Sequence, residues 1–487
     1  MQGYSTKKPV LGGTPAWSVA APARLYAFYA VCLATLLVYL SEYIGFRDQG
    51  DFARAVGGMV RFPEGGIGRA SQMRWDFHPG GFYPVDGFNL AAYVFRALGA
   101  GVWELSTSFH LGMVSLPAKV LVAAAIHMLA SFYARQFQAR YRVQAAAFGI
   151  LAIAVFQAHN IGMLKSFYSE VLVFVFFTVL LAALVGWPRR GAGWWIVAAS
   201  IGMGLTKPQY FYVPLLALAC LLAIRRGQGQ GQGVPWRFVV AMLVGQALCV
   251  LPVLHNPYAQ LNYHRSTYFG SYLVQSTAQL QALGLTPHQQ ACVGIDAWGD
   301  RADGPGGSRP YRKGVSCYRE SPQSLRDVLA PYAADPLTLW RLSVYALPAH
   351  FTVGYFHVFR DLFYVAPAGA DYGPGAVLMK LTAWREATVT PMAVPLVLIG
   401  LALPWWLRRT DRALLAPTLL FLSVFVVTQA VVSLVGEGIR DLSKHLWAAQ
   451  LALDLLVVAL LGQVGLRVAA YRSKPRRAFE RDDSKLP

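Results

Sequence analysis

Two carboxylates beside two arginines stand in the sequence FRDQGDFAR, residues 46–54, directly after the first long apolar run. A carboxylate at the end of a membrane span could act as a general base that takes a proton from a hydroxyl group. Asp48 and Asp51 are therefore candidate catalytic residues, because charges at a membrane boundary are costly unless they have a partner or a function. Solvated acidic residues at a helix end are the structural alternative.

Three further polar clusters follow, each beside an apolar run. Lysine and arginine could bind a phosphate or pyrophosphate group, arginine through two hydrogen bonds at once. Tyr168 and Glu170 could position hydroxyl groups, and His445 could bind phosphate or assist proton transfer. The alternative for each is an ordinary snorkelling or hydrogen-bonded side chain. The candidate binding residues are Arg54, Lys165, Tyr168, Glu170, Lys207, Gln209, Arg440, Lys444 and His445.

The composition indicates a polytopic membrane protein. Of the 487 residues, 55% are hydrophobic and only 14% are charged, unlike a soluble domain. The formal net charge is +19, but the basic residues form clusters between apolar runs instead of one binding face, which argues against nucleic acid as a partner. Under the positive-inside rule these clusters mark cytoplasmic loops, and the lipid bilayer is the expected partner.

Apolar runs and charged loops together predict an all-α fold of about ten to twelve transmembrane helices, with both termini in the cytoplasm. In this topology the polar clusters all reach the external face. Asp454 lies inside the last span. Three roles are open for a carboxylate there: a structural ion pair, a proton-carrying group or a catalytic group. The expected spans lie near residues 23–44, 111–133, 145–164, 171–187, 194–205, 211–224, 238–254, 391–407, 414–435 and 445–466.

The topology divides the chain into four parts. The first external loop, residues 46–110, is mixed and aromatic and is expected to carry interfacial helices. In the large external region, residues 339–380 are either interfacial or part of an extra membrane hairpin. The parts are an N-terminal transmembrane region 1–254, the external region 255–388, the C-terminal helices 389–470 and a basic cytoplasmic tail 471–487.

The five cysteines fall into two groups. Cys32, Cys220 and Cys249 lie inside apolar runs and are expected to be buried small hydrophobic residues. Cys292 and Cys317 flank a glycine-rich segment of the external region, where an oxidising periplasm would favour a disulfide. No spacing of cysteine and histidine resembles a zinc site.

Several short motifs give the chain a family resemblance. They are RDQGDFAR after the first span, FYSE before the fourth, LTKPQ between two short spans, NYHRSTYFG with LGLT downstream, and IRDLSKHLWAAQLALD. In this order they are similar to bacterial membrane hexose transferases of the S-layer glycan type. More broadly, the chain resembles the GT-C superfamily of polyprenyl-phosphate-sugar-dependent glycosyltransferases. The resemblance covers most of the chain, through motifs that are individually short.

The resemblance implies a GT-C-like fold and an inverting transfer of a sugar from a polyprenyl-phosphate donor to a lipid-linked or surface glycan acceptor. The reaction would take place on the periplasmic face of the bacterial inner membrane. The base would be Asp51 or Asp48, and the GDF sequence favours Asp51, although Gln49 and Gly50 separate two acidic residues that are often adjacent in the superfamily. His264, within NYHRSTYFG, becomes a further substrate-binding candidate. Some members bind a divalent cation near this aspartate; we predict no metal and no cofactor.

Two other functional classes remain open. A lipid-linked glycan flippase or a small-molecule transporter would place its charges near the bilayer midplane, often in repeated halves. Here most charges mark helix ends, and no repeat is visible. A surface-polysaccharide polymerase or ligase would depend on a large external loop with arginine and histidine, which the region 255–388 could supply.

Overall fold

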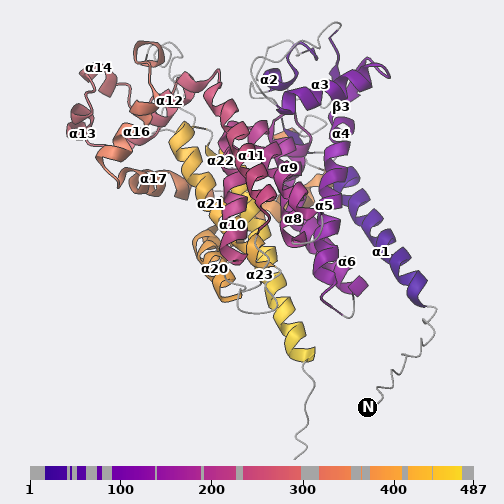
Figure 1. Cartoon of the computed structure of the whole chain (residues 1–487). Coiled ribbons are helices and arrows are strands. Elements are labelled where there is room, and N and C mark those ends of the chain that lie inside the picture. Colours follow the sequence, from indigo (N-terminus) through magenta and orange to yellow (C-terminus); the bar gives the residue numbers. More distant parts are fainter. Residues whose placement is uncertain are drawn as a thin grey trace, which may run out of the picture.

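The computed structural model of the protein is almost entirely helical, with a bundle of apolar helices below and two smaller groups of elements above it (Figure 1). Helix α1 begins and α23 ends at the lower end of the bundle in this view. The described residues are 17–40, 44–46, 52–61, 74–78, 90–137, 140–187, 191–225, 234–297, 317–352, 363–364, 373–407, 415–440 and 442–473.

Six helical segments are long and apolar enough to cross a membrane. The chain therefore has the helices of a membrane-embedded, all-α protein. The segments are Pro22–Tyr39, Leu111–Ala134, Trp236–Leu254, Gly373–Leu407, Ala416–Glu437 and Trp447–Val468. They consist of all or most of α1 (Trp17–Leu33), the π-helix η1 (Ala34–Tyr39), α4 (Leu111–Val114), α5 (Leu116–Ala134), α11 (Trp236–Leu254), α19 (Ala376–Val389), α20 (Ala393–Leu407), α21 (Ala416–Glu437) and α23 (Trp447–Ser473).

The third expected span is broken into α6 (Arg140–Val155) and α7 (Ala158–Leu164), which are bent by 75°. Side chains bind the backbone groups that the break frees, as burial in an apolar bundle requires. Asn160 Nδ2 donates to the Val155 carbonyl at 2.8 Å, and the Ala158 N–H donates to Thr382 Oγ1 at 3.1 Å. If the bent pair counts as one span, the structure has seven candidate crossings.

Three other expected spans are helices that fall short of the ~20 residues that a crossing normally needs. They are α8 (Glu170–Gly186), α9 (Ala192–Thr206) and α10 (Val213–Arg225), with 17, 15 and 13 residues. A 3₁₀ turn, η3 (Pro208–Tyr210), connects α9 to α10, and the two helices pack against each other as a hairpin. A helix is thus present at each of the ten expected positions, but only six of the described helical segments are both long and apolar enough to cross a membrane.

The first loop forms small elements at the upper end of the bundle (Figure 1). Besides the predicted helices it contains short strands, which alternation of apolar residues did not reveal. Strand β1 pairs antiparallel with β4 from the large external region, so this pairing ties the two regions together. The elements of the first loop are β1 (Gly45–Phe46), α2 (Phe52–Val56), β2 (Arg74–Asp76), α3 (Leu90–Trp103) and β3 (Ser108–His110), and β4 is Phe363–Tyr364.

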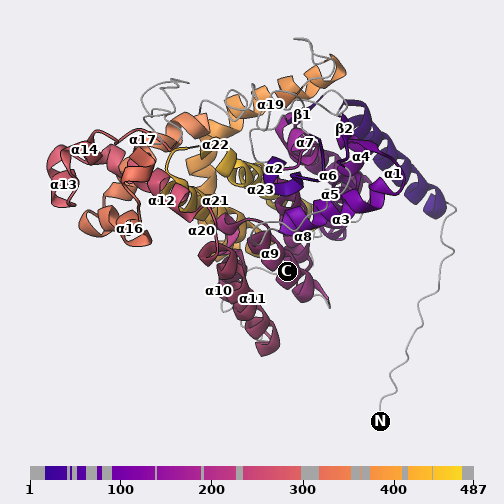
Figure 2. The same cartoon turned by 90° about the horizontal axis from the view of Figure 1, so that it is seen from above.

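The described residues 255–352, in the region expected to be external, form a lobe on the opposite side of the molecule from the elements of the first loop (Figures 1 and 2). The predicted disulfide between Cys292 and Cys317 is confirmed, with their Cα atoms 5.7 Å apart. Both cysteines join Tyr268, Tyr272 and Leu280 in an apolar core separate from that of the bundle. The lobe contains α12 (Ala259–Tyr268), η4 (Ser271–Val274), α13 (Thr277–Ala282), α14 (Pro287–Gln290), α16 (Leu325–Ala334) and α17 (Thr338–Thr352).

The segment expected to be interfacial or membrane-crossing, residues 339–380, begins with α17 and ends in α19. Helix α19 continues through the 3₁₀ turn η7 (Thr390–Met392) into α20, so residues 373–407 form one helical segment of 35 residues. Seen from above, α19 runs along the edge of the molecule (Figure 2). The expected domain boundary at residue 389 therefore falls inside a continuous helix.

Candidate functional site

Three of the predicted polar clusters meet where helices of the bundle end. Glu170 is the first residue of α8, and its Oε1 lies 2.5 Å from Nζ of Lys207, which follows α9. Glu437 is the last residue of α21, and its Oε2 lies 2.7 Å from Nε2 of His445, the last residue of α22 (Leu442–His445). Gln209, two residues after Lys207 in the chain, accepts a hydrogen bond at its Oε1 from His445 Nδ1 at 2.8 Å, so the Lys207 segment reaches the second ion pair.

The local sequence explains why these side chains stand at helix ends. Lys207 precedes a proline, which disfavours the helical conformation for it, and its backbone is extended with φ −147° and ψ 126°. Glu170 occupies a helix N-terminus, where the macrodipole favours a negative charge. Gly438 ends α21 with φ +63°, a left-handed conformation that glycine adopts without strain.

Arg265 on α12 is a member of this cluster that the sequence did not single out. Its Nη1 lies 3.7 Å from Glu437 Oε2, the same oxygen that His445 contacts. Sequence reasoning selected its neighbour His264 instead. Adjacent residues of a helix point about 100° apart, so only one of the two could face the bundle, and the motif alone did not show which.

The cluster is a buried, interconnected polar network. The Glu170 side chain is 1% exposed and the His445 side chain 7%. Two carboxylates face one lysine, one arginine and one histidine, and both ring nitrogens of His445 lie within hydrogen-bond distance of side-chain oxygens. Charges in such low-dielectric surroundings interact strongly with each other and with any charged ligand.

A second group connects this end of the bundle with the first loop. Lys444 Nζ lies 4.6 Å from the centre of the Tyr168 ring, and Tyr168 meets the Phe52 ring edge-on at 5.1 Å. Lys165, at the end of α7, is fully buried. Phe52 begins α2 and directly follows Asp51 in the sequence. The candidate bases themselves, with the Arg54 side chain, lie outside the described residues; they are Asp48 and Asp51.

Arg440 joins the bundle to the lobe. Its Nε lies 3.2 Å from Oδ2 of the fully buried Asp296. In the same turn, the Ile439 N–H donates to the Phe269 carbonyl at 2.9 Å. A Cβ on Gly438 would come within 2.4 Å of the carbonyl oxygens of Arg265 and Phe269. The turn that follows α21 is therefore seated tightly on the end of α12.

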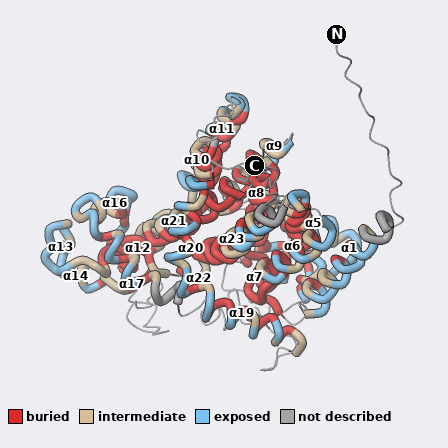
Figure 3. The backbone as a smooth tube through the Cα atoms, turned by 90° about the horizontal axis from the view of Figure 1, so that it is seen from below, coloured by how far each residue is buried: buried red, intermediate tan, exposed pale blue. Residues whose placement is uncertain are grey.

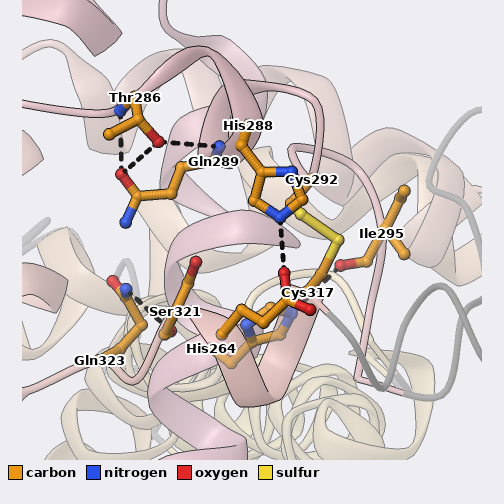
Figure 4. Close-up of a disulfide and its surroundings, with 10 residues drawn as sticks. His264, Thr286, His288, Gln289, Cys292, Ile295, Cys317, Ser321 and Gln323 are labelled. Carbon is orange, nitrogen blue, oxygen red and sulfur yellow. Dashed lines mark hydrogen bonds and ion pairs between the residues drawn. A yellow bond between two sulfur atoms is a disulfide. The ribbon is translucent and has the colours of Figure 1, made fainter.

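His264 lies in the lobe, close to the disulfide (Figure 4). Its Nε2 donates to the Ile295 carbonyl at 3.3 Å, and its ring stacks on Tyr268 with centroids 4.8 Å apart. Burial, with a smaller effect of neighbouring Arg265, lowers the pKa of His264 to about 4. The structure thus places this predicted substrate-binding residue in the packing of the lobe, apart from the network around Glu437.

The lowered pKa of His264 predicts a pH-dependent stability. An unfolded histidine has a pKa of ~6.5, so between pH ~6.5 and ~4 the unfolded state binds more protons than the folded state, and acidification favours unfolding. We expect wild-type protein in detergent to lose on the order of 2–3 kcal/mol of folding free energy across this window. Thermal unfolding at a series of pH values should show the loss, and His264→Gln should flatten it. An equally steep dependence in His264→Gln would contradict this assignment.

Asp454 forms a buried ion pair with Arg385. Arg385 Nε on α19 lies 2.5 Å from Asp454 Oδ1 on α23, and both side chains are almost fully buried. Arg385 Nη2 also donates to Gln450 Oε1 at 2.8 Å. This network fixes α19 across the first turns of α23. Within the part of the chain that the structure describes, no three His, Cys, Asp or Glu side chains gather as metal ligands would.

The chain was compared with family models, solved structures and curated proteins. No family model matches the chain, and no solved structure matches it. Among curated proteins the chain is similar to the uncharacterized protein YfdI of Escherichia coli (strain K12). The two are 24% identical over 353 residues, which cover 70% of this chain and 73% of the relative. The similarity thus extends over most of both proteins and carries no activity with it.

Proposed function

We propose that the protein is a GT-C-like membrane glycosyltransferase. It would move a sugar from a polyprenyl-phosphate donor to a lipid-linked or surface glycan acceptor, with inversion at the sugar C1. The observation that carries the proposal is the network of Glu170, Lys207, Glu437 and His445 at one end of an apolar bundle. Such a site offers charges to a lipid headgroup at the place where its hydrocarbon chain meets the bundle.

In the proposed reaction Asp51 takes the proton of an acceptor hydroxyl. The hydroxyl oxygen forms a bond to the sugar C1 while the bond from C1 to the phosphate oxygen breaks, and polyprenyl phosphate leaves with that electron pair. Lys207, Arg440 and Lys444 stabilise the charge that develops on the phosphate, an effect that commonly dominates catalysis. Tyr168 and Glu170 position the sugar or acceptor hydroxyls.

The ion pairs hold the proposed phosphate-binding side chains in place. Glu170 holds the Lys207 ammonium in place, and Glu437 holds His445 and Arg265, so the cations need little reorganisation during the reaction. Arg440 is bound to Asp296 and thereby also keeps the lobe against the bundle. The contact between Tyr168 and Phe52 supports the assignment of Asp51, because it brings the beginning of α2 to the residues of the Glu170 segment.

We further propose about ten membrane spans, with α8, α9, α10 and the bent α6–α7 pair as the additional crossings. The membrane is the bacterial inner membrane, both termini are cytoplasmic and the network faces the periplasm. Two observations support this orientation. The disulfide lies in the upper lobe, as expected for an oxidising compartment. The arginine-rich turn between α5 and α6 lies at the lower end (Figure 1).

The proposal is tested with purified protein in proteoliposomes. A radiolabelled hexose on polyprenyl monophosphate is supplied, and both the transferred sugar and the released polyprenyl phosphate are measured against protein-free liposomes. Equal amounts of the two products are expected. Transfer of a whole oligosaccharide from a pyrophosphate donor would instead identify a polymerase or ligase. Movement of the lipid-linked sugar across the bilayer without bond cleavage would identify a flippase.

A further inference from the structure

The apolar bundle contains a cavity that the polar network does not line. It is a cavity of about 340 Å³ between α5, α6, α8, α21 and α23, which lie beside one another when the molecule is seen from below (Figure 3). Its walls are aliphatic and aromatic, with Leu129, Leu151 and Leu455 among them. Ile150 and Leu461 also line it and are 50% and 61% exposed, so the cavity opens sideways between α6 and α23.

One polar side chain in the cavity has no hydrogen-bond partner among the described residues. Thr418 lines the cavity, is 5% exposed, and its Oγ1 is buried. A buried hydroxyl without a partner costs about 1–3 kcal/mol, so an occupant that offers an oxygen acceptor would be favoured. Thr418 stands in the first turn of α21. In the proposed topology this end of α21 is cytoplasmic, at the level where a lipid ester carbonyl would lie.

Three arginines flank residues of the cavity wall in the chain. Phe137 and Val143 line the cavity, and Arg135, Arg140 and Arg142 stand beside them in the chain with exposed side chains. The sequence from residue 129 to residue 151 contains no aspartate or glutamate. Clustered arginines at the end of a membrane helix attract anionic lipid headgroups.

We propose that this cavity binds an anionic phospholipid. One acyl chain enters between α6 and α23, an ester carbonyl accepts a hydrogen bond from Thr418, and the phosphate faces Arg140 and Arg142. The volume lies within the range of about 300–1,000 Å³ that is common for ligand pockets. The site is separate from the polar network and does not depend on the proposed transferase activity.

The test measures lipid binding to delipidated protein in detergent by native mass spectrometry. Phosphatidylglycerol and phosphatidylcholine with identical acyl chains are titrated separately. We expect phosphatidylglycerol to bind at least roughly tenfold more tightly, because each arginine near the headgroup adds to the attraction. The double variant Arg140→Gln/Arg142→Gln should lose this preference. Thr418→Val should weaken the binding of both lipids. Ala147→Phe fills the cavity and should therefore weaken the binding of both lipids more than the other variants do.

Two matched variants serve as controls. Ile153→Phe adds a ring to an exposed position of α6 that does not line the cavity, and Arg237→Gln removes an exposed arginine from the first turn of α11. Both should bind lipid as the wild type does. Equal affinity for the two phospholipids, or unchanged binding after the paired arginine substitutions, would overturn the proposal. So would binding of polyprenyl phosphate with no binding of phosphatidylglycerol. The arginines are exposed, so their removal tests the site even if Ala147→Phe does not fold.

Discussion

Asp51→Asn is expected to lower the rate of sugar transfer by about 10²–10⁴-fold, the usual contribution of a general base. The amide is nearly isosteric with the carboxylate but cannot take up the acceptor proton. The measurement is the initial rate of polyprenyl phosphate release in proteoliposomes at saturating donor. A monodisperse peak in detergent should show that the variant protein is folded.

Asp48→Asn is the matched control, because it makes the same change three residues earlier in the same loop. Its rate should fall less than that of Asp51→Asn. Near-wild-type transfer by Asp51→Asn would contradict the assignment of the base. If Asp48→Asn alone is inactive, the two aspartates exchange roles while the proposed reaction stands.

Lys207→Met is expected to destabilise the protein by about 3 kcal/mol, because it leaves the Glu170 carboxylate buried without its cation. Adding Glu170→Gln should recover most of this loss, since the double variant no longer buries an unpaired charge. Sugar transfer should stay low in both variants, because neither has the lysine that we assign to the donor phosphate. Thermal unfolding in one detergent and the transfer assay provide the two measurements.

Lys380→Met is the control for this prediction, because Lys380 is an exposed lysine on α19. Its stability and activity should match the wild type. A double variant no more stable than Lys207→Met would show that the two side chains are not coupled. Full activity of the double variant would remove Lys207 from the proposed mechanism.

The positions of the helices could be predicted from the sequence, but their lengths and bends could not. Apolar runs show where helices form, since each run must be buried or covered by lipid. The break between α6 and α7 at Phe156 and Gln157 contains neither proline nor glycine. It depends on hydrogen bonds from Asn160 and to Thr382, which are tertiary contacts. Hydropathy carries no information about such contacts.

The sequence predicts that the polar clusters lie on one face of the protein, but it does not predict which side chains pair with each other. Alternation of spans placed the Glu170, Lys207 and His445 segments at the same end, and the structure brings them into contact. Arg265, and not His264, contacts Glu437 because of how the ten-residue helix α12 is rotated about its axis. The pairing of Arg385 with Asp454 joins two residues that are 69 positions apart in the chain. Both follow from packing that a single sequence does not encode in any local pattern.

The shortness of α9 has a consequence for the membrane itself. At ~1.5 Å per residue its 15 residues extend about 22 Å, whereas the hydrocarbon layer is ~30 Å thick. In the proposed topology the bilayer beside α8, α9 and α10 must thin locally, or water and headgroups must follow Lys207 below the level of the surrounding surface. Such a depression would carry a lipid phosphate down to the buried charges, so that the donor reaches the network without leaving the membrane.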